Sequence, residues 1–336
     1  AALSGLDVLA TAETGGGKTL AFLLPLVTHV LAQPELRKGE GPIAVVAAPT
    51  RELAMQTHKV CRQVCRGLGG ALHVAAIVGG VDKGEQFRRL KAGAEVAVCT
   101  PGRMLDLLRM GACSARRVTF VVLDEADRML DMGFGPQVSS LLGQFRPDRQ
   151  TLLFSATMPG HVKTLAADLL RAPVMVAVGA EEGEPLKGVL QRCLFPRDEA
   201  DKLAAVAELL RSRIDEGDVV VFAGQKARVE LLTAQLCGLG FKAVGLHGDM
   251  DQAQRVRALQ ELKQGRCHVL VATDVAARGL DIRSIATVVN FDPPRDAETY
   301  VHRIGRTGRA GDRGCEAVSL VTPRDARFAA LLQEHL

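Results

Sequence analysis

VTFVVLDEAD, residues 118–127, is the stretch of sequence that decides the fold. It is apolar almost without a break as far as Leu123 and then ends in the carboxylates of Asp124 and Glu125. An apolar run without polar alternation is typical of a strand that is buried on both faces, as in parallel sheets covered by helices. Ligands of such sheets bind at the carboxyl ends of the strands, so the two carboxylates are expected at a binding edge.

Similar apolar runs occur throughout the chain, and helical stretches separate them. In the first half we predict strands at residues 43–49, 73–79, 95–101, 118–124 and 151–157. In the second half we predict strands at residues 218–224, 242–248, 267–274, 286–292 and 315–322. Strands that alternate with helices form parallel sheets, so the sequence predicts an α/β protein. Because the pattern runs twice, we expect two tandem domains that face each other across a cleft.

The segment GAEEGEPLKG, residues 179–188, interrupts this rhythm with Gly, Pro and three carboxylates. We interpret it as a linker between a first domain at residues 1–178 and a second at residues 189–336.

The composition is globular, with 47% apolar and 24% charged residues in a chain of 336. The longest apolar run, residues 20–27, is interrupted by Pro25 and is too short to cross a bilayer, so no membrane association is predicted. The net charge is +4, with 20 basic against 15 acidic residues in 1–180 and 22 against 23 in 181–336. Any affinity for nucleic acid must therefore come from the local placement of basic groups.

The 8 cysteines are scattered, and only Cys61 and Cys65 are close neighbours. A single CxxxC pair without further ligands at metal-binding spacing is weak evidence for zinc, so free thiols are expected.

A candidate phosphate site precedes all of these strands, in TAETGGGKT at residues 11–19. The motif fits [A/G]xxxxGK[S/T], with Ala12 in the first place. In such a loop consecutive backbone N–H groups point at phosphate oxygens. A flexible turn that leads into a helix is the alternative interpretation. The candidate residues are Thr14, Gly15, Gly16 and Gly17 for the phosphates, Lys18 for the terminal phosphates, and Thr19 for Mg²⁺.

Asp124 and Glu125 can supply the rest of the chemistry at such a site. One carboxylate can hold Mg²⁺, here Asp124, and the next, Glu125, can orient and deprotonate the attacking water. The alternative is a solvated acidic start of a helix, which is less favoured behind an apolar strand.

The motifs taken together resemble those of DEAD-box RNA helicases of superfamily 2, in order and spacing. They are AETGGGKT (12–19), PTRELA (49–54), TPGR (100–103), DEAD (124–127), SAT (155–157), HGDMDQAQR (247–255), VATDVAARGLDI (271–282) and HRIGRTGR (302–309). The resemblance covers essentially the whole chain. It implies two RecA-like domains that close on ATP, Mg²⁺ and RNA, and an RNA-stimulated ATPase that locally separates short duplexes. An ATP-gated RNA clamp with little turnover is the alternative, and a DNA translocase is disfavoured.

The resemblance also implies a role for SAT in coupling the two ligand sites. Ser155 and Thr157 would bond both Asp127 and His302, whereas ordinary satisfaction of polar groups at a strand end is the simpler interpretation.

HRIGRTGR places arginines at 303, 306 and 309, along one side of a helix or extended turn. By resemblance, Arg306 and Arg309 act as arginine fingers on the γ-phosphate, and Asp281 contacts the ribose. A basic helix face that merely solvates the surface is the alternative.

RNA is expected to be held through phosphates and 2′-hydroxyls, because the chain has 1 Tyr and no Trp for base stacking. For each RNA residue, a role as turn former or helix cap is an equally good interpretation. The RNA contacts implied by resemblance are Pro49, Thr50, Arg51, Gly79, Gly80, Thr100, Arg103, Gln252, Arg255, Thr273 and Asp274.

The chain departs from the family pattern in two places. The family carries an adenine-reading glutamine ahead of the phosphate loop, and this chain begins at Ala1; we expect the chain to bind nucleotide weakly and to discriminate bases poorly. VFAGQKARVE, residues 221–230, has Gly224 where the family usually has an Asn-Thr-Lys-like sequence.

Stretches outside the shared motifs look like the DEAD-box subgroup associated with early spliceosome assembly. They are residues 39–46, 124–134, 146–157 and 246–252. This resemblance implies spliceosomal or other ribonucleoprotein partners, a monomeric core and a nuclear location; ribosome assembly, mRNA handling and a cytoplasmic location remain open.

Overall fold

The computed structural model describes residues 1–12, 17–37, 39–67, 72–178, 189–277, 285–307 and 315–335. The chain divides into two compact units, residues 1–179 and 180–336, and each is described by itself. The predicted linker at 179–188 lies outside the described residues. So do five of the candidate site residues, Thr14, Gly15, Gly16, Asp281 and Arg309.

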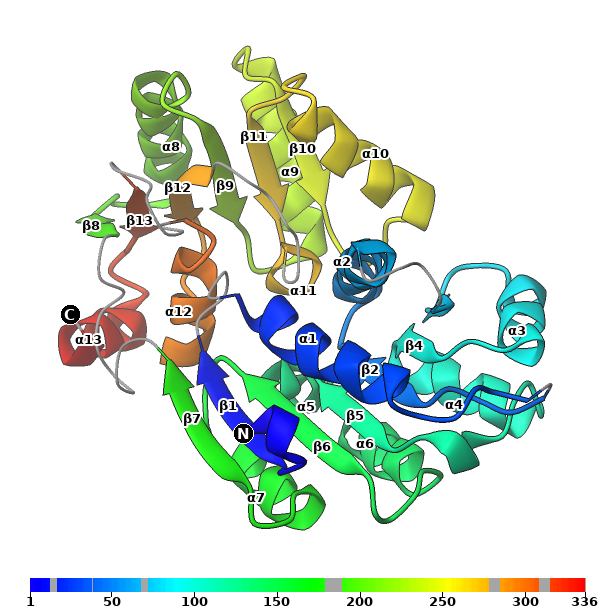
Figure 1. Cartoon of the computed structure of the whole chain (residues 1–336). Coiled ribbons are helices and arrows are strands. Elements are labelled where there is room, and N and C mark those ends of the chain that lie inside the picture. The colour runs from blue at the N-terminus through cyan, green and yellow to red at the C-terminus, as the bar shows by residue number, and fades with distance from the viewer. Residues whose placement is uncertain are drawn as a thin grey trace. The chain divides into compact units, whose positions relative to one another are not determined.

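The first unit is built on a seven-stranded sheet with the order β3-β4-β2-β5-β6-β1-β7. Every neighbouring pair in it is parallel. Figure 1 shows the sheet in colours from blue to green. Its strands are β1 (Val8–Ala12), β2 (Ala44–Ala47), β3 (Val74–Ile77), β4 (Val96–Cys99), β5 (Phe120–Leu123), β6 (Gln150–Ser155) and β7 (Val174–Val178).

Helices cover both faces of this sheet, because alternate side chains of its strands enter two separate cores. In β5, Phe120 and Val122 belong to one core and Val121 and Leu123 to the other. The first core packs under α1 (Lys18–Leu31) and α2 (Arg51–Gly67). The second packs under α3 (Lys83–Ala92), α4 (Pro101–Arg109), α5 (Ala126–Asp131), α6 (Gly135–Leu142) and α7 (Gly160–Leu169). Short 3₁₀ turns lie at η1 (Ala2–Ser4) and η2 (Ala115–Arg117).

The second unit repeats the plan with a six-stranded parallel sheet, in the order β10-β11-β9-β12-β13-β8. Its strands are β8 (Leu190–Leu194), β9 (Asp218–Phe222), β10 (Ala243–Leu246), β11 (Val269–Ala272), β12 (Ile285–Asn290) and β13 (Glu316–Leu320). One face is covered by α8 (Glu199–Arg213) and α9 (Lys226–Gly238). The other is covered by α10 (Gln252–Lys263), α11 (Asp274–Ala277), α12 (Ala297–Ile304) and α13 (Ala326–His335).

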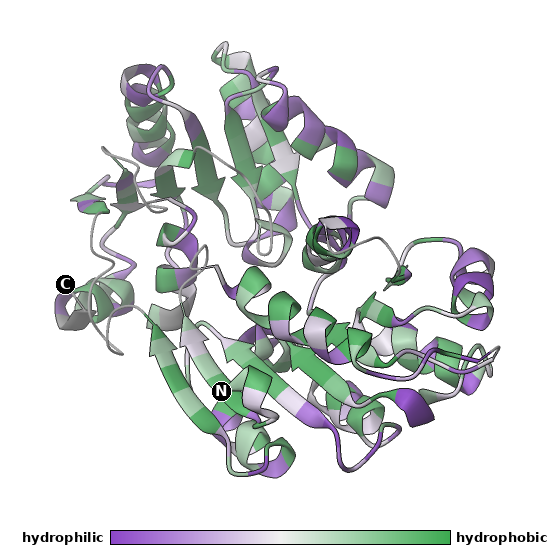
Figure 2. Cartoon of the chain, viewed as in Figure 1, coloured by the Kyte–Doolittle hydropathy of each residue, from purple (hydrophilic) through white to green (hydrophobic). Residues whose placement is uncertain are grey.

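The structure confirms the predicted α/β class and all ten predicted strands, with ends that differ by a few residues. Figure 2 shows the strands of both sheets as predominantly hydrophobic, which is the property that made them visible in the sequence. Three strands were missed, β1, β7 and β8. None of the eight cysteines, all of which lie in the described ranges, forms a disulfide bond. Within the described ranges, no helix combines the length and apolarity that a membrane crossing needs.

Candidate functional site

The carboxyl edge of the first sheet divides the candidate residues into two neighbouring groups. Strands β1, β6 and β5 are adjacent in the sheet, and they lead into the phosphate loop, SAT and DEAD respectively. Strands β2, β4 and β3 are also adjacent, and they lead into PTRELA, TPGR and the Gly79-Gly80 pair. Because β5 pairs with β2, the candidate nucleotide and RNA groups meet along one continuous edge.

The described part of the phosphate loop is a tight turn into α1. Gly17 caps the helix with φ of 78°, a left-handed conformation that favours glycine. The Lys18 ammonium donates a hydrogen bond to the carbonyl oxygen of Ala12 at 2.8 Å. This bond connects the first residue of α1 to the last residue of β1. Thr19 is half-buried in the first helical turn. A cation and a hydroxyl thus stand together at the start of α1.

In the acidic pair after β5, Asp124 is buried and Glu125 is half-buried. Asp124 is 4% exposed, and burial raises its pKa to about 7, assisted by the negative charge of Glu125 and opposed by the positive charge of Lys18. Glu125 has φ of 53°, which is unfavourable for a residue with a side chain. Its carboxylate accepts a bond from Arg128 Nη1 at 3.1 Å. The alternative of a solvated helix start is therefore wrong.

These residues fit a hard divalent cation such as Mg²⁺, which prefers oxygen ligands. Burial keeps water away from the Asp124 carboxylate and so disfavours its negative charge, which raises its pKa. A bound cation would favour the charged form. The Thr19 hydroxyl supplies a second oxygen of the kind Mg²⁺ accepts. Within the described ranges, no cluster of three His, Cys, Asp or Glu side chains offers a separate metal site.

Asp127 ties DEAD to SAT through a buried network. Asp127 is only 1% exposed. Its Oδ2 accepts hydrogen bonds from the backbone N–H groups of Ala156 and Thr157 at 3.1 and 3.0 Å. The Thr157 hydroxyl donates to the same oxygen at 3.0 Å. Ser155 Oγ accepts from the Asp127 N–H at 3.3 Å and donates to the Thr157 carbonyl at 2.7 Å. The two motifs therefore form one hydrogen-bonded unit.

Arg51 organises the candidate RNA side of this edge. Its Nη1 donates to the carbonyl oxygens of Gly79 and Gly80 at 3.3 and 3.0 Å. Gly80 has φ of +69°, a left-handed conformation that favours glycine, and a Cβ on it would lie 2.8 Å from Arg51 Nη1. The same loop is held from the other side by Arg103, whose Nη1 donates to the Val81 carbonyl at 3.0 Å.

Three more candidates on this side lie at helix starts. Pro49 and Thr50 precede α2, and the Thr50 hydroxyl accepts from the Leu53 N–H at 3.3 Å as a cap. Thr100 is the N-cap of α4, with extended backbone. The structure therefore places helix N-termini at the ends of both β2 and β4, where backbone N–H groups can reach phosphate oxygens.

In the second unit, Gln252 and Arg255 lie in the first turn of α10 and are half-buried. Asp251 caps this helix, and its carboxylate accepts from the Gln254 N–H at 2.8 Å. The Gln254 side chain in turn accepts from the Asp251 N–H at 3.0 Å. This capping box fixes the start of α10 and so the position of both candidates.

Asp274 has a structural partner that the sequence did not reveal. Its two carboxylate oxygens accept from Arg303 Nε and Nη2 at 2.6 and 2.9 Å. Arg303 is 2% exposed and also donates to Asn290 Oδ1 at 3.1 Å and to the Asp292 carbonyl at 2.6 Å. Thr273, next to Asp274, is half-buried at the end of β11. Arg303 is thus a central residue of this edge that sequence reasoning missed.

Arg303 and Arg306 of HRIGRTGR are both buried, and they do not lie on one helix. Helix α12 ends at Ile304, and Arg306 follows it in a turn. Arg306 is 6% exposed and its Nε donates to the His302 carbonyl at 3.3 Å. His302 itself is half-buried in α12. For the two arginines of this motif that are described, 303 and 306, the alternative of a solvated basic face is wrong.

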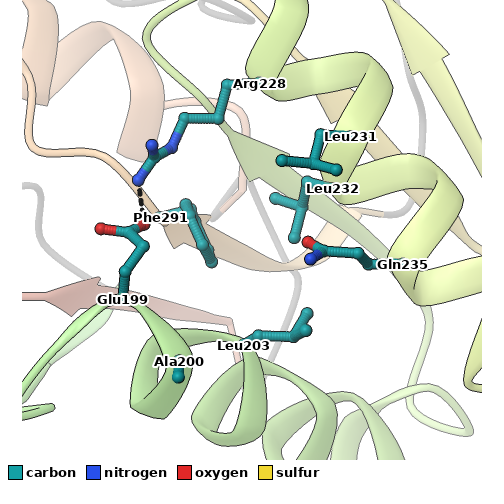
Figure 3. A pocket seen from close by; sticks show the side chains of 8 residues that line it. All are labelled: Glu199, Ala200, Leu203, Arg228, Leu231, Leu232, Gln235 and Phe291. Carbon is teal, nitrogen blue, oxygen red and sulfur yellow. Dashed lines mark hydrogen bonds and ion pairs between the residues drawn. The ribbon is translucent and has the colours of Figure 1, made fainter.

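Gly224, where the sequence departs from the family pattern, contacts Asp292. The Gly224 N–H donates to Asp292 Oδ2 at 2.8 Å. Arg228, from the same segment, lies 3.2 Å from Asp292 Oδ1 and also pairs with Glu199. Figure 3 shows this Arg228–Glu199 pair at the rim of a pocket of about 300 Å³. The pocket is otherwise lined by Ala200, Leu203, Leu231, Leu232, Gln235 and Phe291.

Comparison with known proteins gives two family matches. Residues 1–165 match the model described as "DEAD/DEAH box helicase", and residues 201–311 match "Helicase conserved C-terminal domain". The chain is 54% identical over 334 residues to "DEAD-box ATP-dependent RNA helicase 24" of Arabidopsis thaliana, covering 99% of this chain and 44% of that protein. The chain therefore spans less than half the length of this relative.

Two solved structures are similar over nearly the whole chain. The structure described as "S. cerevisiae Dbp5 bound to RNA and ADP BeF3" has a TM-score of 0.84 and 32% identity, covering 98% of this chain and 83% of that one. The structure of the yeast "DEAD-box splicing factor Prp28" has a TM-score of 0.52 and 34% identity, covering 98% and 76%. These similarities confirm the predicted fold class, two RecA-like parallel-sheet domains in tandem.

Proposed function

Since this chain belongs to the DEAD-box RNA helicase family, we propose that it hydrolyses ATP in an RNA-stimulated reaction and uses it to separate short RNA duplexes locally. The relatives that carry this activity in their names are longer than the chain, which spans 44% of the Arabidopsis protein. We therefore base the proposal on the residues of this chain.

The observation that carries the proposal is the shared carboxyl edge of the first sheet. Lys18, Asp124 and Glu125 follow β1 and β5, while the residues proposed to hold RNA follow β2, β4 and β3. A buried carboxylate with a raised pKa beside a cation is a feature that enzymes use at reacting centres.

In the proposed reaction Lys18 binds the terminal phosphates, and Thr19 and Asp124 would hold Mg²⁺, which supplies charge compensation for the phosphates when bound. Glu125 orients the attacking water and accepts its proton. Its strained backbone and the bond from Arg128 fix the direction of its carboxylate. Arg306, and by resemblance Arg309, would stabilise charge that develops on the transferred phosphoryl group.

RNA is proposed to bind through its backbone. Arg51 and Arg103 hold the loop around Gly80, and the starts of α2, α4 and α10 offer backbone N–H groups to phosphates. Such contacts carry no base information, so affinity is expected to fall steeply with salt and to vary little with RNA sequence.

Steady-state ATPase assays with RNA, with DNA of the same sequence and with no nucleic acid test the proposal. Wild type should respond to RNA, and Glu125→Gln should lose hydrolysis while retaining nucleotide binding. Equal stimulation by DNA would contradict the choice of RNA. Hydrolysis that survives in Glu125→Gln would contradict the catalytic assignment.

Multiple turnover with strand release from a short duplex supports a helicase. A chain that holds RNA after one round of hydrolysis would instead be an ATP-gated clamp. Single-turnover phosphate-release kinetics on a labelled duplex separate these outcomes, because a clamp releases product far more slowly than it performs the chemistry.

We further propose a role in pre-mRNA splicing, within the nucleus, for a core that is monomeric. The likeness to the splicing factor Prp28 supports this proposal. Affinity purification of the tagged protein should recover spliceosomal RNA, and microscopy should place it in the nucleus. Recovery of ribosomal precursors instead would favour ribosome assembly, and sedimentation would test the monomeric state.

A further inference from the structure

The positive charge of the first half of the chain is concentrated in one stretch. Residues 51–92 hold 8 basic and 3 acidic side chains, a net charge of +5. This equals the whole net charge of residues 1–180, which hold 20 basic and 15 acidic side chains. The remainder of the first unit is therefore neutral, and the excess lies on α2 and α3.

On α2 the basic residues form a single stripe. Lys59, Arg62 and Arg66 are spaced by three and four residues, which places them on one side of a helix. The apolar face of α2, formed by Leu53, Ala54, Thr57, His58, Cys61 and Cys65, is buried against the sheet. At 100° per residue the stripe is centred about 130° around the helix from that buried face. All three basic side chains are accordingly exposed.

The stripe is also uncompensated. The nearby cations Lys83 and Arg89 pair with Asp106 and Glu85 at 3.2 and 2.5 Å. Lys59, Arg62 and Arg66 have no such acidic partner among the residues that the structure describes. Three like charges along one helix face repel one another, which costs a few tenths of a kcal/mol per pair without a counter-charge. A polyanion would remove this cost.

The stripe continues from the proposed RNA site. Helix α2 begins at Arg51, which holds Gly79 and Gly80, and Lys59 lies two turns further along the same helix. The distance from Arg51 to Arg66 along the axis is about 22 Å at 1.5 Å per residue. An RNA that leaves the proposed RNA site, at the ends of β2, β3 and β4, and continues along α2 would therefore pass these three side chains.

We propose that Lys59, Arg62 and Arg66 form an auxiliary phosphate-binding surface, which holds the part of an RNA strand that extends beyond the proposed RNA site. This inference rests on the proposed RNA binding and adds a second, length-dependent contact to it. The surface contains exposed cations and offers no stacking ring, so it would not read base identity.

The test compares wild type with Lys59→Ala/Arg62→Ala/Arg66→Ala, because alanine preserves the helix. Fluorescence anisotropy is measured with oligouridine of about 8 and about 20 nucleotides over a range of KCl concentrations. For the longer RNA the variant should bind at least about tenfold more weakly at 100 mM salt. Its slope of log affinity against log salt should shrink by about 2, since each lost contact to a single strand removes about 0.7. For the shorter RNA the change should stay below about twofold.

A matched control removes the same charge elsewhere in the first unit. Arg116, Lys163 and Arg171 are exposed and lie outside the basic stretch. Arg116→Ala/Lys163→Ala/Arg171→Ala should leave both affinities and the slope close to wild type. If both triple variants lost the same RNA affinity, the loss would come from the change in net charge and not from the stripe. That result would overturn the proposal.

Two further outcomes also overturn it. If the stripe variant bound the longer RNA as tightly as wild type, the stripe would not bind RNA, and another partner such as an acidic protein would be favoured. Equal loss for both RNA lengths would make the stripe part of the primary site. Failure of the underlying function looks different, because wild type would then bind neither RNA and show no RNA-stimulated hydrolysis.

Discussion

Asp274 and Arg303 form a two-point ion pair, with Oδ1 2.6 Å from Nε and Oδ2 2.9 Å from Nη2. The pair joins the start of α11 to α12, and Arg303 is almost fully buried. A residue expected to contact RNA thus also supports the turn that carries Arg306.

The first prediction is that Asp274→Ala destabilises the second unit by about 3–5 kcal/mol, because it leaves a buried guanidinium without its carboxylate. Urea unfolding followed by circular dichroism measures this loss. Asp274→Asn keeps an oxygen acceptor and should lose less. An unfolding midpoint for Asp274→Ala equal to that of wild type would show that the ion pair contributes little. Any loss of RNA binding should be interpreted only after this measurement.

Asp124→Asn should stabilise the first unit while abolishing Mg²⁺-dependent hydrolysis. Burial and the neighbouring Glu125 raise the pKa of Asp124 to about 7, so its charged form is costly at pH 8. Removal of that charge should raise the unfolding free energy by on the order of 1 to 3 kcal/mol. Thermal unfolding at pH 8 without nucleotide checks the gain, and ATPase assays check the loss. A lower melting temperature would show that hydrogen bonds to the charged carboxylate outweigh its burial.

Gly224→Asn should be tolerated. A Cβ at this position would lie 3.5 Å from Asp292 Oδ2, an ordinary contact, and the backbone is not left-handed. Loss of glycine flexibility in the unfolded chain should stabilise Gly224→Ala by about 0.4–1 kcal/mol. Gly224→Asn should match it in stability and change RNA affinity only through its amide. If both variants were destabilised, the bond from the Gly224 N–H to Asp292 would be the sensitive feature.

His58 should make the first unit sensitive to acid. Its ring is buried, Nε2 lies 3.1 Å from the Val74 carbonyl, and burial lowers its pKa, with smaller contributions from the charges of Arg62 and Arg89. A histidine with a lowered folded pKa contributes stability that is present above its unfolded pKa, about 6.5, and is lost as pH falls below that value. His29 has a lowered pKa for the same reason.

The urea midpoint of wild type should therefore fall between pH 7.5 and 5.5 by more than that of His58→Gln, which cannot titrate at this position. The decrease that remains in the variant is assigned to His29 and other groups. Identical decreases in the two proteins would mean that folding leaves the pKa of His58 unchanged.

Most of the strands that the sequence predicted are buried on both faces, and β3 and β10 are the half-buried exceptions. Each of the four residues of β2, β4 and β5 is buried, so these strands appear as unbroken apolar runs. The missed strands β7 and β8 are mostly exposed or half-buried edge strands, and β8 carries Arg192 in its centre. Strand β1 was missed although it is longer than β2 and mostly buried. The phosphate loop should have indicated it, since such loops follow a strand.

The site residues were predictable where a motif is local, as in Gly17, Lys18 and the acidic pair. The role of Arg303 was not, because its partners Asp274, Asn290 and Asp292 are brought to it only by the order of β9, β11 and β12 in the sheet. The concentration of charge on α2 was hidden for a different reason. A count over half the chain averages residues 51–92 with a neutral remainder.

The place of β1 in the sheet has a consequence for how the chain is made on the ribosome. Its residues pair with β6 and β7, so Val8 must wait for Leu152 and Val174 before it has neighbours. Strand β1 is therefore synthesised well before the two strands that hold it in the sheet. The strands that carry the proposed RNA residues, β2, β3 and β4, pair within about fifty residues of one another. Contacts of long sequence separation form slowly, so a growing chain should become able to bind nucleotide only once β6 and β7 have been synthesised.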